Sequence, residues 1–249
     1  MKLLVCLVTT CLAPVLVRLH QEAPAAEFVC PPCGEECHFT TYPAAGGCGV
    51  CGMALVPLSS VPQVGVLVLP QTTLASSMTT LAVFSAANVG RVFTVADTAQ
   101  PLRLSDALEI RPQFALAQAP ALDVLVVTDG YGIWDDELVV EWVRAAAARA
   151  RAVVAVGRGA LVLARAGLLA GERVPADAVL ARRGSELVEG VHFDVDLAYR
   201  RSGKLFLARD PGSALDACLA AIAELGGPER ARGAATALGH AWTPGVEER

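Results

Sequence analysis

Residues 151–167 read Arg-Ala-Val-Val-Ala-Val-Gly-Arg-Gly-Ala-Leu-Val-Leu-Ala-Arg-Ala-Gly. The first part is a short, continuous apolar run, which is typical of a strand buried on both faces of a parallel sheet. Gly157 and Gly159 then permit a tight turn, and a helix is predicted to follow and to end at Gly167. Strand, turn and helix in direct succession are the repeating unit of an α/β domain.

The same alternation continues along most of the chain. Further buried strands are predicted at residues 64–69, 91–96 and 122–128, and helices at residues 74–87 and 135–150. Asp135 and Asp136 suit the positive end of the second of these helices. Parallel strands joined by helices predict an α/β fold with a doubly wound, mostly parallel sheet. We assign this domain to residues 59–249.

Length and charge limit the classes of function. A chain of 249 residues is long enough for one substantial domain and a small additional module. The formal net charge is -5, and no basic stripe interleaves with aromatic residues. Nucleic-acid binding is therefore not expected.

Residues 1–26 have the pattern of a secretory signal peptide. Lys2 precedes an apolar run from Leu3 to Val17, and small residues surround a candidate cleavage position near Ala25. The pattern predicts a periplasmic or secreted protein. The alternative is an uncleaved N-terminal anchor, which would attach the protein to a membrane.

Residues 27–58 form a second unit, a cysteine module that resembles a zinc ribbon. Five of the chain's eight cysteines lie between positions 30 and 51. Cys30 and Cys33 form one C-x-x-C pair, and Cys48 and Cys51 form a second pair after fourteen intervening residues. Two such pairs supply the four thiolates of a tetrahedral metal site. The predicted metal is zinc or another thiophilic ion, copper included.

Other residues between and beside the two pairs could also bind the ion. Cys37 and His38 offer further ligand atoms, and Met53 carries a soft thioether. Disulfides are the alternative, since an oxidising compartment favours them in small modules. An odd number of cysteines opposes complete internal pairing. A redox pair made by Cys30 and Cys33 is a further alternative.

Two segments of the module form a further pattern, Phe28-Val-Cys30-Pro31 and Gly46-Gly-Cys-Gly-Val-Cys-Gly-Met-Ala-Leu55. Through these segments the module resembles the heavy-metal-binding domain of bacterial efflux and envelope proteins. Gly49 stands where that family usually has proline, so the match is to a variant. The resemblance implies metal binding without identifying the metal.

The larger domain contains a series of short segments in a recognisable order and spacing, namely Val64–Leu69, Leu81–Phe84, Leu122–Val127, Gly130-x-Gly132, Gly159–Leu161, Ala166–Leu169, Ser202–Lys204 and Asp210–Leu215. In these segments, residues 63–239 resemble the ThiJ/PfpI group of the class I glutamine-amidotransferase-like superfamily. The resemblance implies a flavodoxin-like sheet. The resemblance is also compatible with a homodimer.

The family resemblance locates an active site whose usual side chains are replaced here. The nucleophilic cysteine of the family falls on Gly157, its acidic partner on Ser76, and its histidine near Asp177. A glycine has no side chain that could attack a carbonyl group. The domain is therefore interpreted as a pseudoenzyme, although Ser76, Asp129, Arg158 and Asp177 could still border a polar cleft at the carboxyl ends of the strands. Cys218 is predicted to be inert core, and His192 and His240 have no predicted partners.

Together these features favour an exported metal-binding protein whose degenerate α/β domain serves as a scaffold or a partner-binding unit. Two alternatives remain open from the sequence. One is a ThiJ/PfpI-type hydrolase or lyase with non-standard residues, or an enzyme that uses the metal centre itself. The other is the thiol redox module.

Overall fold

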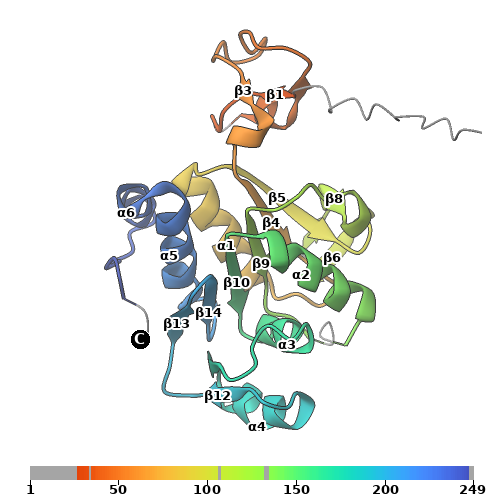
Figure 1. Cartoon of the computed structure of the whole chain (residues 1–249), viewed down its shortest axis with the longest axis vertical. Helices are drawn as coiled ribbons and strands as arrows, with labels where there is room; N and C mark the ends of the chain where they lie inside the picture. Colours follow the sequence, from red (N-terminus) through yellow and green to blue (C-terminus); the bar gives the residue numbers. More distant parts are fainter. Residues whose placement is uncertain (1–26, 34, 106–107, 132–134, 247–249) are drawn as a thin grey trace, which may run out of the picture.

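The computed structural model of the chain describes residues 27–33, 35–105, 108–131 and 135–246. A small module, drawn in red and orange at the top of Figure 1, is joined by one linker to a larger α/β domain. The predicted signal or anchor segment, residues 1–26, lies outside the described residues.

A sheet of seven strands, counted within the described residues, forms the centre of the large domain. Its strand order is β13-β14-β10-β9-β4-β5-β8. Every neighbouring pair is parallel except β13 and β14, which form an antiparallel pair at one edge. The strands are β4 (Gln63–Leu67), β5 (Arg91–Ala96), β8 (Phe114–Ala115), β9 (Val124–Val127), β10 (Ala152–Val156), β13 (Tyr199–Ser202) and β14 (Leu205–Ala208).

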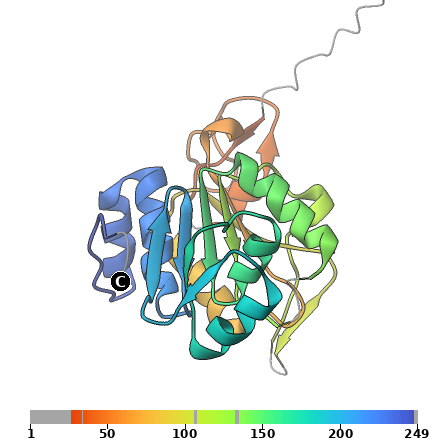
Figure 2. The same cartoon turned by 60° about the horizontal axis from the view of Figure 1, so that its bottom comes forward.

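Helices cover both faces of this sheet (Figures 1 and 2). One face is covered by α1 (Leu74–Ala87) and α5 (Ala214–Gly226), on which α6 (Pro228–Ala237) packs, and the other by α2 (Glu137–Arg149) and α3 (Gly159–Arg165). The remaining helix, α4 (Ala178–Leu187), packs against β12 (His192–Asp194).

Alternate residues of one strand face opposite layers, which explains the continuous apolar runs. In β9, Val124 and Val126 belong to the core beneath α1 and α5, whereas Leu125 and Val127 belong to the core beneath α2 and α3. All four side chains are fully buried. A strand covered on both faces must be apolar at every position.

The structure confirms the predicted α/β fold. The helix at 74–87 and the strand at 91–96 have the predicted bounds, and the other predicted strands and helices differ by no more than two residues at either end. The predicted helix at 135–150 begins at Glu137, because Asp136 caps it by accepting hydrogen bonds from two backbone N–H groups. Cys218 is fully buried in α5, as predicted.

The cysteine module contains very little regular structure. Its three short antiparallel strands pair in the order β2-β1-β3, and along the chain a 3-10 turn lies between β1 and β2. These elements are β1 (Phe28–Val29), the 3-10 turn (Glu36–Phe39), β2 (Thr41–Tyr42) and β3 (Val56–Pro57). A second 3-10 turn, Leu58–Ser60, leads directly into β4.

The large domain also contains short elements outside the central sheet. Two small two-stranded sheets are formed by β6 (Leu102–Ser105) with β7 (Leu108–Ile110), and by β11 (Arg173–Pro175) with β12 (His192–Asp194). A 3-10 turn at Leu116–Gln118 follows β8. No helix in the described part of the chain has the length and apolar character needed to cross a bilayer.

Candidate functional site

The fold of the module brings its cysteines together from three separate segments. Cys30 follows β1, Cys37 lies in the 3-10 turn, and Cys48 and Cys51 lie in the loop between β2 and β3. Gly52 closes that loop at a φ of 75°, in the left-handed region that favours glycine. Its N–H donates to the carbonyl oxygen of Cys48 at 2.9 Å. Gly49, which the sequence also suggested as a turn residue, does not adopt a positive φ.

Four sulfur atoms are grouped as a metal ion would require. The Sγ atoms of Cys30, Cys37, Cys48 and Cys51 all lie within 4.8 Å of one another. In a tetrahedral zinc site with Zn–S bonds of about 2.3 Å, neighbouring sulfurs are about 3.8 Å apart. One ion could therefore bond to all four after small side-chain adjustments.

Cys33 and His38, which were also predicted as ligands, are not part of this four-thiol set. The Sγ atom of Cys33 lies 3.4 Å from that of Cys37 and 3.8 Å from that of Cys30. The ring of His38 packs against Phe39, with ring centroids 4.3 Å apart. The side chain of Met53 is 41% exposed. The sequence could not show that Cys37 is more central than Cys33.

The described cysteines are all free thiols. The Sγ atoms of Cys30 and Cys51 are 3.2 Å apart, whereas a disulfide bond has a length of about 2.0 Å. The arrangement therefore matches a reduced ligand cluster better than a pair of disulfides.

The thiols of the cluster differ in how readily they ionise. The backbone N–H groups of Cys51 and Val50 donate to the sulfur of Cys48 and lower its pKa to about 6. Burial raises the pKa of Cys37 to about 12 and also raises the pKa of Cys30, and most of the contacts with neighbouring thiols act in the same direction. A buried thiolate without a nearby positive charge is unfavourable, so a bound cation would supply the charge that these two need.

Tyr42 is an outer contact of the cluster that the sequence did not reveal. Its hydroxyl lies 3.7 Å from the Sγ atom of Cys48. Donation from this hydroxyl helps to lower the pKa of Cys48. Nothing in the spacing of Tyr42 from the cysteines pointed to this role.

Replacing Tyr42 by Phe should weaken zinc binding, because a hydrogen bond to a ligand sulfur is lost. Outer contacts of this kind typically change metal affinity by about 10- to 100-fold. Competition with a chromophoric chelator would measure the affinity. Tyr131→Phe, in the large domain, is the matched control and should bind zinc as the unmodified protein does. Equal affinities for the two variants would contradict the role assigned to Tyr42.

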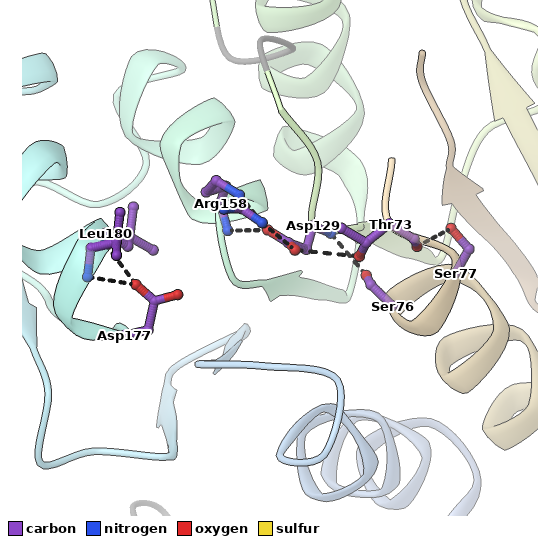
Figure 3. Close-up of polar contacts among 8 residues, drawn as sticks. Thr73, Ser76, Ser77, Asp129, Arg158, Asp177 and Leu180 are labelled. Atoms are coloured by element: carbon purple, nitrogen blue, oxygen red, sulfur yellow. Dashed lines mark hydrogen bonds and ion pairs between the residues drawn. The ribbon is translucent and has the colours of Figure 1, made fainter. Parts of the chain in front are cut away.

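A second polar cluster lies at the carboxyl ends of three neighbouring strands. Asp129 follows β9, Arg158 follows β10, and Thr73 and Ser76 lie at the start of α1 after β4. The Asp129 N–H donates to the Ser76 Oγ at 2.8 Å, and the Thr73 hydroxyl donates to the Asp129 carboxylate at 3.3 Å. Figure 3 shows these side chains converging on Asp129.

Arg158 and Asp129 form a paired, largely buried contact. The guanidinium donates from Nε at 2.9 Å and from Nη2 at 2.8 Å, one bond to each carboxylate oxygen. Its carbon Cζ also lies 3.8 Å from the ring centroid of Tyr131. Burial disfavours the charged guanidinium, but the hydrogen bonds and charge of Asp129 outweigh this and raise the pKa of Arg158. The charge of Arg158 is therefore balanced within the protein by the Asp129 carboxylate.

The Asp129 carboxylate occupies the space that a side chain at position 157 would need. Gly157 has a φ of 53°, and a Cβ atom built on it would lie 2.8 Å from Asp129 Oδ1. A cavity of about 150 Å³ beside Tyr131 is small compared with ligand sites of about 300–1,000 Å³. Asp129 and Arg158 do not line that cavity.

The remaining predicted residues lie apart from this cluster. Asp177 caps α4 by accepting from the N–H groups of Val179 and Leu180, and Figure 3 shows it apart from the side chains that surround Asp129. His240, which had no predicted partner, lies with its Nε2 3.0 Å from an Asp216 carboxylate oxygen. His192 is exposed in β12.

The two clusters lie at opposite ends of the central sheet. The module contacts the amino ends of the strands, where Arg91, the first residue of β5, donates to the Phe39 carbonyl oxygen at 3.4 Å and lies over its ring. The Asp129 cluster lies at the carboxyl ends. An ion held by the thiol cluster would therefore lie at the other end of the sheet from the Asp129 cluster.

The fold and the site define an α/β protein with a flavodoxin-like sheet and a separate cluster of thiols. The sequence profile of the DJ-1/PfpI family matches residues 62–224, which are well over half of the chain. The chain belongs to the DJ-1/PfpI family. The matched residues begin after the cysteine module.

Individual relatives agree with this assignment. An isonitrile hydratase from Pseudomonas putida is 40% identical over 76 residues, which cover 29% of this chain and 33% of that protein. The match thus spans about a third of that curated relative.

Solved structures share the fold. A ThiJ/PfpI family protein from Pseudomonas syringae superposes with a TM-score of 0.64 at 23% identity, covering 75% of this chain and 78% of that one. Drosophila melanogaster DJ-1beta gives a TM-score of 0.64 at 22% identity, covering 73% of this chain and 99% of that one.

Proposed function

We propose that this chain is an exported metal-binding protein whose cysteine module holds one zinc ion or another thiophilic cation. The observation that carries the proposal is the group of four Sγ atoms within 4.8 Å of one another. Thiolate ligands select soft or borderline cations, so zinc and copper(I) fit the site, whereas calcium and magnesium do not.

The composition of the module also supports a bound cation. Its buried apolar and cysteine side chains are Val29, Cys30, Cys37, Cys48 and Leu55. Three of these are cysteines of the cluster, so few other side chains are left to stabilise the fold. Modules of this size usually need a metal or disulfides for stability, and all five cysteines of the module are free thiols.

The DJ-1/PfpI domain acts in this proposal as a scaffold or a partner-binding unit without the nucleophile of its family. Two observations support this role. The first is the family resemblance, which implies that the nucleophile position is occupied by Gly157, and the second is the Asp129 carboxylate, which fills the space that a side chain at Gly157 would need. Export of the protein is supported by the apolar run Leu3–Val17 after Lys2.

Metal analysis of the full chain, purified under reducing conditions, tests the proposal directly. We expect one zinc per chain, and cobalt(II) substitution should give the visible absorption of a tetrahedral thiolate site. A metal-free protein whose module cysteines are joined in two defined disulfides would refute the proposal.

A lyase activity like that of the isonitrile hydratase is the second candidate function. The local identity of 40% over 76 residues favours it. The absence of a side chain at position 157 opposes it, because covalent catalysis needs a nucleophile there. Turnover of an isonitrile by the purified protein would favour this second candidate.

A further inference from the structure

The module contains five thiols, but a tetrahedral centre needs only four. Cys33 is the additional thiol, and its sulfur atom lies next to the set of four. Its Sγ atom is 3.8 Å from that of Cys30, which equals the sulfur spacing of about 3.8 Å in a tetrahedral zinc site. It is 3.4 Å from the Sγ atom of Cys37.

We propose that Cys33 and Cys37 are alternative fourth ligands of one metal ion, which Cys30, Cys48 and Cys51 hold in both forms. This inference rests on the metal-binding function proposed above. When Cys33 replaces Cys37, the Cys33 sulfur loses its proton as it bonds to the ion, and the departing Cys37 thiolate takes one up. The number of thiolates on the ion stays at four, so the exchange changes neither the charge of the centre nor any oxidation state.

The two alternative ligands differ in their access to solvent. Cys37 is 4% exposed, whereas Cys33 is only partly buried. An ion bound through Cys37 is enclosed by the module, and an ion bound through Cys33 lies closer to the surface. An external thiol or chelating ligand could then attack the ion in the Cys33 form.

A centre with this property is suited to metal transfer, whereas a closed structural zinc site has only the four ligands that it needs. The expected partner is therefore a metal acceptor or donor that presents thiolate ligands of its own.

Single and double substitutions in the full chain test the exchange. Zinc content and zinc release to 4-(2-pyridylazo)resorcinol would be measured for Cys33→Ser, Cys37→Ser and the double variant. Each single variant should keep one zinc per chain, because the other thiol completes the site. Release should become about tenfold slower in Cys33→Ser and about tenfold faster in Cys37→Ser, a size typical of changes around a metal centre. The double variant should bind zinc much more weakly than either single variant.

Cobalt(II) absorption gives a second measurement, which reports directly whether each variant still forms a four-thiolate site. Cys218→Ala removes a thiol that is buried in α5. This control should leave both zinc content and release rate unchanged.

Two results would overturn the exchange while leaving the proposed function in place. One is loss of zinc from Cys37→Ser, which would make Cys37 an obligatory ligand. The other is release from Cys33→Ser at the rate of the unmodified protein. An unmodified protein without zinc would instead overturn the proposed function, and the exchange with it.

Discussion

The Cys48→Ser variant is expected to lose its zinc and the ordered structure of residues 28–56, while the DJ-1/PfpI domain stays folded. Cys48 is the thiol of the cluster whose pKa is lowered to about 6, so it supplies a thiolate most readily near neutral pH. The free energy of binding at structural zinc sites is about 10–16 kcal/mol, and this energy is available to the fold of the module. Elemental analysis would measure the zinc, and hydrogen exchange would report the order of each part separately.

The large domain should stay folded, because its two apolar cores contain no cysteine of the module, although Phe39 of the module packs against one of them. Cys218→Ala is again the control for removal of one thiol, and it should retain one zinc per chain. If Cys48→Ser kept one tightly bound zinc, the four-thiol site would be wrong as described.

The second large effect is expected at Gly157, where any side chain, that of cysteine included, should destabilise the domain. A non-glycine residue in the left-handed conformation costs about 1–2 kcal/mol. The new Cβ atom would also lie 2.8 Å from Asp129 Oδ1, and crowding of this kind costs about 1–3 kcal/mol more. We therefore expect Gly157→Ala and Gly157→Cys to lower the free energy of unfolding by about 2–5 kcal/mol in urea titrations.

The variant Gly167→Ala separates the cost of the left-handed conformation from the cost of crowding. Gly167 has a φ of 76°, but no atom lies within 4 Å of the position of an added Cβ. This variant should lose only the conformational part, about 1–2 kcal/mol. The difference between the two alanine variants then measures the contact with Asp129.

A double variant tests the same contact from the other side. Asp129→Gly removes the carboxylate, so Gly157→Cys should cost less in that background than in the unmodified protein. If Gly157→Ala and Gly167→Ala lowered the free energy of unfolding equally, a side chain at position 157 would not be crowded by Asp129. Full additivity of Gly157→Cys with Asp129→Gly would contradict this crowding independently.

Local sequence pattern was sufficient for the four central strands of the sheet and for the helices that join them. The apolar run of β10, the glycines at 157 and 159, and the helix at 74–87 were predictable because each depends on residues that are neighbours along the chain. The acidic start of α2 was also visible, although only the structure shows that Asp136 is the capping residue. Periodicity reports which faces are buried, and burial on both faces decides this fold.

Contacts between distant segments could not be predicted in this way. Arg158 is 29 residues from Asp129, and the two meet because β9 and β10 are adjacent in the sheet. His240 likewise finds Asp216 only when the chain after α6 packs back against α5. Such pairs depend on strand order and helix packing, which leave no periodic signal in the sequence.

For the cysteine module, the sequence by itself determined that thiols are concentrated there, that they occur as two C-x-x-C pairs, and that the pattern is typical of metal binding. Only the tertiary structure decided that Cys37 joins the set of four and that Cys33 lies beside it. It also decided that this set is at the opposite end of the sheet from Gly157. The physical reason is that ligand type is a property of each residue, whereas the convergence of ligand atoms depends on how three short strands and two turns pack around them.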